Sequence, residues 1–241
     1  MECVRQKAEI TYENTLEGVL LRRVNRFTAE AEIDGKPATV HIRNTGRLEN
    51  LLLPRARITV QRSDNPERKT PYDLISVYRP GFKWVNVDSL APNMLMKQWL
   101  QCGNFDEVKA EYTYGNSRFD FFMRMNDRKI LREVKGCTLA DDQKSGIGYF
   151  PDAPTERGLK HIEELIAAKK EGYTCQLAFV IQMNGIHLVF PNNKIQPAFG
   201  AALYRAAKAG VTILEYSCHV EADSIRITGE TADAPRRQWL L

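Results

Sequence analysis

The chain has 241 residues, of which 43% are hydrophobic and 27% are charged, so it can form a packed core and allows one large domain or two modest ones. Its five cysteines are widely spaced and form no Cys-x-x-Cys pair, which excludes a disulfide framework and a zinc pattern. Neither a signal peptide nor an apolar run near the ~20 residues of a membrane-spanning helix is visible, and the formal net charge is only +4, so we expect a soluble cytoplasmic protein.

The first third of the chain has the alternating pattern of short β-strands. Residues 16–62 alternate apolar and polar side chains and turn at Asp34-Gly35, and the segments DLISVYRP and KWVNVD continue the pattern. Stretches rich in Pro, Asn and Asp, such as SDNPERKTP, separate these segments. About five short strands in ~80 residues predict a small antiparallel barrel, which we assign to residues 1–86.

The basic charge is concentrated in this predicted barrel. Residues 1–100 carry 16 basic and 12 acidic side chains, whereas residues 101–241 carry 18 of each. A local basic surface attracts a phosphate backbone, but a solvated basic face with no partner fits this small excess equally well. The barrel arginines that we expect to contact nucleic acid are Arg22, Arg23, Arg26, Arg43, Arg47 and Arg57.

From residue 87 onward, helical and strand patterns alternate. SLAPNMLMKQWLQCG has helical apolar spacing, and TERGLKHIEELIAAKKEG is a second helix with Thr155 as its N-cap and Gly172 just beyond its end. CQLAFVIQM is a continuous apolar run that is typical of a buried central strand. This order predicts a mixed-sheet α/β domain over residues 87–228 and a polar tail over residues 229–241, so the whole chain is predicted to be an α+β protein of two domains.

Two carboxylates and a lysine occupy strand patterns in the second domain. Asp120 lies in one apolar run and Glu133 in the next, and a hairpin turning at Asn126-Asp127 would place the two side by side. Two neighbouring carboxylates repel each other unless a proton or a cation lies between them, and a divalent ion with oxygen ligands is a natural solution. Glu133 and Lys135 share a strand face, which would bring the ammonium close to such an ion. The alternative is an exposed Glu–Lys pair with no chemical role.

The helix after the loop at residues 139–152 adds basic side chains near its start. Arg157, Lys160 and His161 would lie beside the proposed carboxylates and could contact a phosphodiester. The alternative is an ordinary salt-bridged helix face.

Several motifs carry a resemblance to a known family. They are NTG at residues 44–46, SDNPERK, RFDF, EVKGCTL and, most specifically, the long block YFPDAPTERGLKH, and together they cover residues 16–227. In these motifs the chain resembles the sugar fermentation stimulation protein family of bacteria and archaea. The resemblance implies an N-terminal OB-fold joined to a domain of the PD-(D/E)xK nuclease class, DNA binding, and regulation of sugar catabolism, maltose especially. Asp120, Glu133 and Lys135 match the nuclease signature, Glu111 matches an upstream acidic position, and Phe119 replaces the proline of the literal signature.

The sequence therefore predicts a cytoplasmic DNA-binding protein with a nuclease-type site. In this hypothesis Asp120 and Glu133, helped by Glu111, bind one or two Mg²⁺ or Mn²⁺ ions, and Lys135 orients the attacking water. The main alternative is a DNA-binding transcriptional regulator that keeps the nuclease fold but cleaves nothing. A third is a structural protein that responds to a sugar or nucleotide and has no DNA role. A homodimer is compatible with all three.

Overall fold

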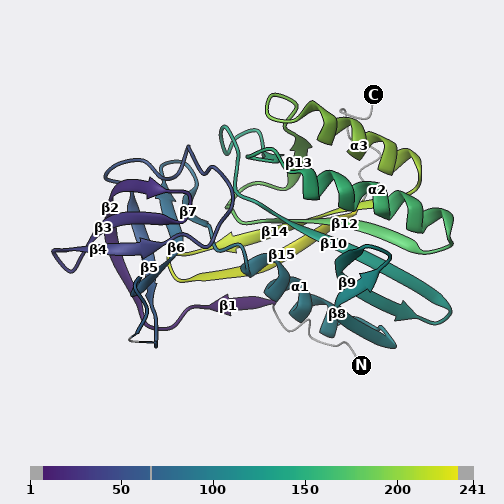
Figure 1. The fold of residues 1–241 in the computed structure, drawn as a ribbon, viewed down its shortest axis with the longest axis horizontal. Helices are drawn as coiled ribbons and strands as arrows, with labels where there is room; N and C mark the ends of the chain where they lie inside the picture. The colour runs from purple at the N-terminus through teal and green to yellow at the C-terminus, as the bar shows by residue number, and fades with distance from the viewer. Residues whose placement is uncertain (1–7, 66, 233–241) are drawn as a thin grey trace.

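The computed structural model describes residues 8–65 and 67–232, which form two β-rich domains that lie side by side (Figure 1). The first is a small barrel and the second is a larger mixed sheet with helices, which confirms the predicted α+β fold. No helix among these residues is both long enough and apolar enough to cross a membrane. The strands of the barrel domain are β2 (Thr15–Asn25), β3 (Thr28–Ile33), β4 (Lys36–His41), β5 (Arg57–Arg62), β6 (Tyr72–Arg79) and β7 (Lys83–Asn86).

Five strands close the barrel. They run in the order β4-β3-β2-β5-β6, and β4 also pairs with β6 in parallel, which joins the two ends. The predicted hairpin turn is present between β3 and β4, where Asp34 and Gly35 both have positive φ, as a two-residue hairpin turn requires. Alternate side chains such as Leu20, Ile58 and Leu74 fill the interior and are at most 1% exposed. β7 extends the sheet beside β6 toward the second domain.

A seven-stranded sheet forms the second domain, with the order β1-β15-β14-β12-β10-β9-β8. The three central strands β10, β12 and β14 are parallel, and the outer strands pair antiparallel to them on both sides. A separate small sheet contains β11 and β13. The strands are β1 (Glu9–Thr11), β8 (Glu107–Tyr114), β9 (Ser117–Met125), β10 (Arg128–Cys137), β11 (Ile147–Phe150), β12 (Thr174–Ile181), β13 (Leu188–Pro191), β14 (Thr212–Val220) and β15 (Ser224–Ala232), and the helices are α1 (Ala91–Gln101), α2 (Glu156–Lys170) and α3 (Pro197–Lys208).

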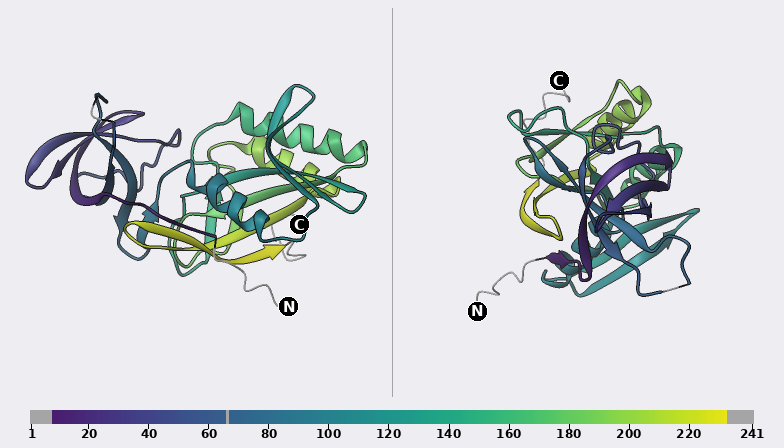
Figure 2. Two further views of the ribbon diagram at one scale, coloured as in Figure 1. Left: turned by 90° about the horizontal axis from the view of Figure 1, so that it is seen from below. Right: turned by 90° about the vertical axis from the view of Figure 1, so that its left-hand side faces the viewer.

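Helices cover both faces of this sheet. α2 and α3 lie on one face, where Ile162 and Phe199 pack in the same apolar cluster as Phe179 of β12. α1 lies on the opposite face and contributes Leu95 and Met96 to a second cluster (Figure 2). β12 is therefore buried on both sides, which explains its continuous apolar sequence.

The capping residues of α2 are those expected from the sequence. The Thr155 hydroxyl accepts a hydrogen bond from the Gly158 amide at 2.9 Å, and Lys169 and Lys170 occupy the last turn. Gly172, with φ of 93°, follows the helix. The cap fixes where the helix begins, and it thereby fixes the position of the first-turn side chains relative to β10.

Two domain boundaries differ from the sequence prediction. β1 lies within the predicted barrel range of residues 1–86, but it pairs with β15 at the edge of the second sheet through Ile10↔Ile225. β15 itself continues to Ala232, so Gly229–Ala232 belong to a strand and not to the predicted tail. Both segments gain backbone hydrogen bonds from a neighbouring strand, a long-range effect that local polarity does not reveal. Residues 233–241 of the predicted tail lie outside the described residues.

A buried polar network joins the two domains. The Asn86 amide donates to the Gln182 carbonyl at 3.0 Å, and the Gln182 side chain donates to Asn86 Oδ1 at 2.8 Å. The Asp88 carboxylate, 1% exposed, accepts hydrogen bonds from Arg43 at 3.0 Å and from the Tyr12 hydroxyl at 3.2 Å. Asn86, Asp88 and Gln182 are buried and hydrogen-bonded, so these contacts specify how the barrel sits on the second domain.

Candidate active site

The β9–β10 hairpin brings the two predicted carboxylates together. Its register pairs Ile130 with Met123 and Arg132 with Phe121, so Glu133 follows directly opposite Asp120. The regular pairing ends there, and Asp120 Oδ2 accepts a hydrogen bond from the Val134 amide at 2.7 Å. The hairpin predicted from the sequence is therefore confirmed. Asp120 and Glu133 lie side by side on its two strands, as strand periodicity predicts.

The Glu133 carboxylate is 2% exposed and only partly satisfied. Its Oε1 lies 2.5 Å from Lys135 Nζ and also contacts His161 Nδ1. Its Oε2 is buried and has no hydrogen-bond partner among residues 8–65 and 67–232. Leaving a buried acceptor unpaired costs about 1–3 kcal/mol, so this oxygen is suited to a ligand such as a metal ion.

The two carboxylates are electrostatically coupled. Burial, followed by repulsion from Glu133, raises the pKa of Asp120, although the Val134 amide, Lys135 and Asn93 oppose that rise. Burial would also raise the pKa of Glu133, but the charge of Lys135 and the contact with His161 outweigh it and hold that pKa below its usual value. A divalent cation between the two would remove the repulsion and use the free oxygen of Glu133.

Asn93 is a neighbour of Asp120 that the sequence analysis did not identify. It lies in the first turn of α1, and its side-chain amide donates to Asp120 Oδ1 at 2.8 Å. The preceding Pro92 begins the helix, and its ring lies close to Gly136 of β10. No local signal in the sequence relates α1 to the hairpin, because 27 residues separate Asn93 from Asp120.

His161, predicted from the sequence as a phosphate contact, is held against Glu133 at the inner side of the basin at the start of α2. It is 4% exposed, and its ring nitrogen faces Glu133. The buried side of α2 carries it toward β10, so it orients the carboxylate and is shielded from solvent. Arg157 and Lys160 remain exposed, and together with Arg118 they line a basin of about 530 Å³ at the start of the helix.

Glu111 does not join the proposed metal site. It occupies an irregular position in β8, with φ of 55°, where the regular pairing of β8 with β9 skips it. Its side chain is 71% exposed and pairs with Arg118 at 3.5 Å. Within the described part of the chain, no group of three or more His, Cys, Asp and Glu side chains is placed to hold a metal ion. The predicted three-carboxylate site is therefore corrected to the pair Asp120 and Glu133.

Two of the predicted barrel arginines, Arg23 and the exposed Arg26, hydrogen-bond to the backbone of a neighbouring loop. Arg23 donates to the carbonyls of Arg47, Gly46 and Arg26, and Arg26 donates to the Thr45 carbonyl at 2.6 and 3.0 Å. Burial lowers the pKa of Arg23. These bonds hold the segment at residues 44–48, which we call the barrel loop, in one conformation.

The other predicted arginines also have intramolecular partners. Arg43 pairs with Asp88 in the interdomain network, which gives it a structural role that the sequence did not indicate. Arg22 pairs with Glu30 at 2.7 Å and Arg57 with Glu17 at 3.0 Å on the barrel surface. Arg47, by contrast, is about half exposed, and its closest carboxylate, that of Glu49, lies 4.0 Å away.

Asp152 connects the barrel loop to the second domain. Its Oδ2 accepts a hydrogen bond from the Leu48 amide at 3.3 Å, and a Cβ at Gly46 would lie only 2.2 Å from the same oxygen. Burial raises the pKa of Asp152, while hydrogen bonds from nearby backbone amides oppose the rise. The sequence analysis singled out both NTG and FPDAPTERGLKH, but it did not predict that the two motifs touch.

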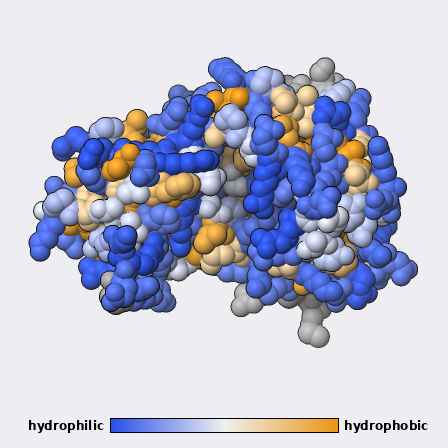
Figure 3. Space-filling model, viewed as in Figure 1, coloured by the Kyte–Doolittle hydropathy of each residue, from blue (hydrophilic) through white to orange (hydrophobic). Residues whose placement is uncertain are grey.

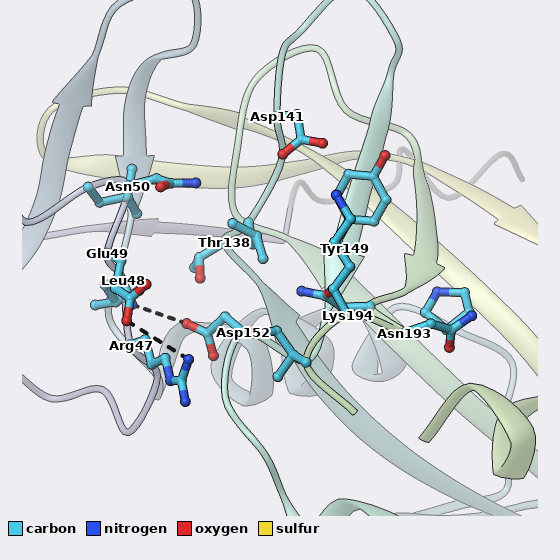
Figure 4. Close-up of a pocket in the computed structure, with 15 residues that line it drawn as sticks. Arg47, Leu48, Glu49, Asn50, Thr138, Asp141, Tyr149, Asp152, Asn193 and Lys194 are labelled. Carbon is cyan, nitrogen blue, oxygen red and sulfur yellow. Dashed lines mark hydrogen bonds and ion pairs between the residues drawn. The ribbon is translucent and has the colours of Figure 1, made fainter. Parts of the chain in front are cut away.

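Cavities lie on both sides of this contact. One cleft of about 270 Å³ contains Lys135 and is bounded by the barrel loop, the start of α1 and residues 150–155. The other cavity, about 400 Å³, lies beyond Asp152 and is lined by Tyr149 and Lys194 among others (Figure 4). Figure 4 shows Asp152 pointing toward the Arg47–Leu48 backbone, and Asp152 and Thr138 line both cavities.

Comparisons with known proteins agree with this architecture. Residues 21–87 match the family model "SfsA N-terminal OB domain", and residues 88–224 match "Sugar fermentation stimulation protein RE domain". A "Sugar fermentation stimulation protein homolog" of Desulfitobacterium hafniense is 48% identical over 217 residues, which cover 89% of this chain and 93% of the relative. A protein of the same name from Ruminiclostridium cellulolyticum is 44% identical over 220 residues, which cover 90% of this chain and 96% of the relative. The structure described as Pyrococcus furiosus SfsA in complex with Ca²⁺ is similar with a TM-score of 0.80 at 25% identity, covering 92% of this chain and 96% of that one. Barrel, mixed sheet and motifs thus agree in placing the chain in the sugar fermentation stimulation protein family.

Proposed function

We propose that this protein binds DNA and hydrolyses a phosphodiester bond with a divalent metal ion held by Asp120 and Glu133. The observation that carries the proposal is the buried, unpaired Oε2 of Glu133, which lies in a carboxylate pair beside Lys135. Among the described residues, Oε2 of Glu164 is also buried without a hydrogen-bond partner, but only Glu133 lies in a coupled carboxylate pair beside a lysine, which is the arrangement that a cation would complete. The Ca²⁺ named for the Pyrococcus furiosus relative supports a cation with oxygen ligands.

Each neighbouring side chain has a defined task in this proposal. When bound, the ion supplies Lewis-acid stabilisation of charge on the phosphate oxygens. Lys135 keeps two ammonium hydrogens beyond its contact with Glu133, and these can hold the attacking water against the phosphate. His161 and Asn93 are positioning residues, because each fixes a carboxylate through one hydrogen bond. Oε2 of Glu133 stays available for a ligand, and each oxygen of Asp120, which accepts one hydrogen bond from Asn93 or Val134, keeps a second lone pair.

The surroundings of the site suit a polar, anionic ligand. The face drawn in Figure 3 is mostly hydrophilic, with small and scattered apolar patches. Arg118, Arg157 and Lys160 lie exposed near the start of α2, where a phosphate backbone could reach them. Cys137, Cys175 and Cys218 are buried and form no disulfide with one another, which supports a reducing compartment such as the cytoplasm.

A non-catalytic regulator of sugar catabolism, maltose especially, is the second candidate. It is favoured by the small number of protein ligands, since only two carboxylates face one another and the described residues contain no larger metal-binding group. In that role the same surfaces would bind DNA, and the triad Asp120, Glu133 and Lys135 would serve stability or regulation instead of turnover.

The deciding experiment is a cleavage assay on purified protein. Linear single-stranded and duplex DNA would be incubated with Mg²⁺ or Mn²⁺, and Asp120→Ala purified in parallel would control for contaminating nucleases. We expect metal-dependent products from the wild type and none from the variant. Binding without cleavage in either metal would support the regulator, and equal cleavage by both proteins would remove Asp120 from the site.

A further inference from the structure

The reacting groups of the candidate site are recessed. Glu133 is 2% exposed, and the Lys135 side chain is 16% exposed. Lys135 is reached through the cleft of about 270 Å³, which has Thr45 of the barrel on one wall and Ser89 and Ala153 of the second domain on the others. A ligand must therefore place a phosphate inside a narrow concave space that both domains form.

The barrel loop that bounds this cleft is held in place from several sides. The Asn44 side chain donates to the Val87 carbonyl at 2.9 Å and accepts from the Gly46 amide at 2.7 Å. Arg23 and Arg26 bind the loop carbonyls from the barrel side, and Asp152 contacts Gly46 from the second domain. With anchors at both ends, the width of the cleft is a fixed property of the fold.

Exposed cations lie on both sides of the recessed groups. On the barrel side, Arg26 and Arg47 line a surface depression with Ala153. On the other side, Arg157 and Lys160 line the basin at the start of α2. The depression shares Arg26, Thr45 and Gly46 with the cleft, and the basin includes Glu156, the residue after Thr155 of the cleft. Cations therefore border the cleft at both neighbouring surfaces, each of which also contains one glutamate, Glu49 or Glu156.

We infer that the candidate site takes a single strand of DNA and excludes a duplex, an inference that rests on the proposed function. A duplex is a stiff, convex rod with a persistence length of about 50 nm, so bringing one of its phosphates into a recessed cleft requires a deformation that proteins induce only at a cost in free energy. A single strand is flexible, so one phosphate can lie beside Lys135 while its neighbours reach the cations on either side. The substrate class is therefore set by the anchored barrel loop as much as by the carboxylates.

Binding to a pair of tryptophan variants tests this inference without relying on cleavage. Ser89 lines the cleft and is exposed, so Ser89→Trp would fill the entrance. Its neighbour Leu90 is 51% exposed and does not line the cleft, so Leu90→Trp is the matched control. Fluorescence anisotropy would be measured in Ca²⁺ with a labelled strand of roughly 20 nucleotides, which exceeds the length that one OB-fold binds, and with the same sequence as a duplex.

We expect the single strand to bind more tightly than the duplex, and Ser89→Trp to weaken single-strand binding about tenfold while Leu90→Trp leaves it unchanged. Melting temperatures of both variants would verify that they are folded. Equal affinity for strand and duplex, or single-strand binding that neither variant alters, would overturn the inference. Absence of any DNA binding would overturn it together with the proposed function. Single-strand binding that Ser89→Trp blocks, with no cleavage in Mg²⁺ or Mn²⁺, would uphold the inference and reject only the nuclease activity.

Discussion

The barrel and the second domain use their charged side chains in different ways. The barrel holds the excess of basic residues, yet most of the arginines expected to bind nucleic acid have partners inside the protein. The second domain has no net charge in residues 101–241, yet it buries two coupled carboxylates and leaves one oxygen of Glu133 unpaired. Net charge thus points to the barrel, whereas the coupled carboxylate pair with its unpaired oxygen points to the second domain, which is where we propose the ligand site.

The largest expected effect tests the chemical role of the second domain. Lys135→Ala should reduce metal-dependent cleavage by on the order of 10²-fold or more, because it removes the group that orients the nucleophile beside the phosphate. Cleavage rates and melting temperatures would be measured on the same preparations.

Lys144→Ala is the matched control for Lys135→Ala. Asp142-x-Lys144 repeats the acidic-x-Lys pattern, but it lies in an exposed loop before β11. This substitution should leave cleavage unchanged. If Lys135→Ala cleaved as fast as Lys144→Ala, Lys135 would be half of a surface pair and the role assigned to it would be wrong.

A second prediction concerns the contact between the two domains. Gly46→Ala would place a methyl group against the short, half-buried Asp152 side chain, which also accepts a hydrogen bond from the Leu48 amide. We expect a loss of about 1–3 kcal/mol in the free energy of unfolding, the usual cost of overpacking. Gly229→Ala, where a Cβ meets nothing within 4 Å, should be close to neutral. Chemical denaturation of both variants would show whether the barrel loop is anchored as described.

The difference between local and distant relations explains what could be predicted from the sequence. The pairing of Asp120 with Glu133 follows from strand periodicity and one turn, both of which are local, so it was predicted correctly. The N-cap at Thr155 is also local and was found. By contrast, His161 meets Glu133 across 28 positions, and Asn93 meets Asp120 across 27, and neither contact leaves a pattern in the sequence.

The sequence also could not predict which intramolecular partner each charged side chain has in the fold. Arg23, Arg43 and Arg47 look alike in the chain, but the fold gives the first two internal partners and leaves the third half exposed. Glu111 was placed on the correct neighbouring strand, but an irregularity in that strand turned it to solvent. Such choices depend on packing between elements, which a single sequence does not encode locally.

The pH dependence of the free energy of unfolding tests the coupling between the two carboxylates of the second domain, and its expected effect is smaller. Because the pKa of Asp120 is raised, its contribution to stability is complete below the pKa of the unfolded chain and is lost as the pH rises through the folded value. Glu133 has the opposite sign, since its pKa is lowered and its contribution disappears as the pH falls through the folded value. In metal-free protein near neutral pH, Asp120→Asn should therefore raise the free energy of unfolding by about 1 kcal/mol.

That gain should shrink as the pH falls through the raised pKa of Asp120, because the protonated carboxyl no longer repels Glu133. Thermal melts in EDTA between neutral and acidic pH would measure the difference. The control is Asp64→Asn in an exposed barrel loop, for which we expect no pH-dependent difference. A destabilised Asp120→Asn protein at neutral pH would show that hydrogen bonds to the carboxylate outweigh its repulsion with Glu133.

The smallest expected effect concerns the few barrel cations that are free to bind. Arg47 is about half exposed, and its carboxylate neighbour lies 4.0 Å away, so its guanidinium can contact a phosphate with little loss of internal bonding. Arg22 is even more exposed, but Glu30 binds it through two hydrogen bonds of 2.8 and 2.7 Å.

Each phosphate contact on a single strand contributes about 0.7 to the slope of log K against log salt concentration. Arg47→Ala should therefore lower the magnitude of that slope by about 0.7 and weaken binding a few-fold, whereas Arg22→Ala should leave the slope unchanged. Anisotropy titrations at several salt concentrations would separate the two. Equal slopes for both variants would mean that local pairing does not decide which barrel arginines bind, and the contrast between the two domains would then rest on the carboxylates alone.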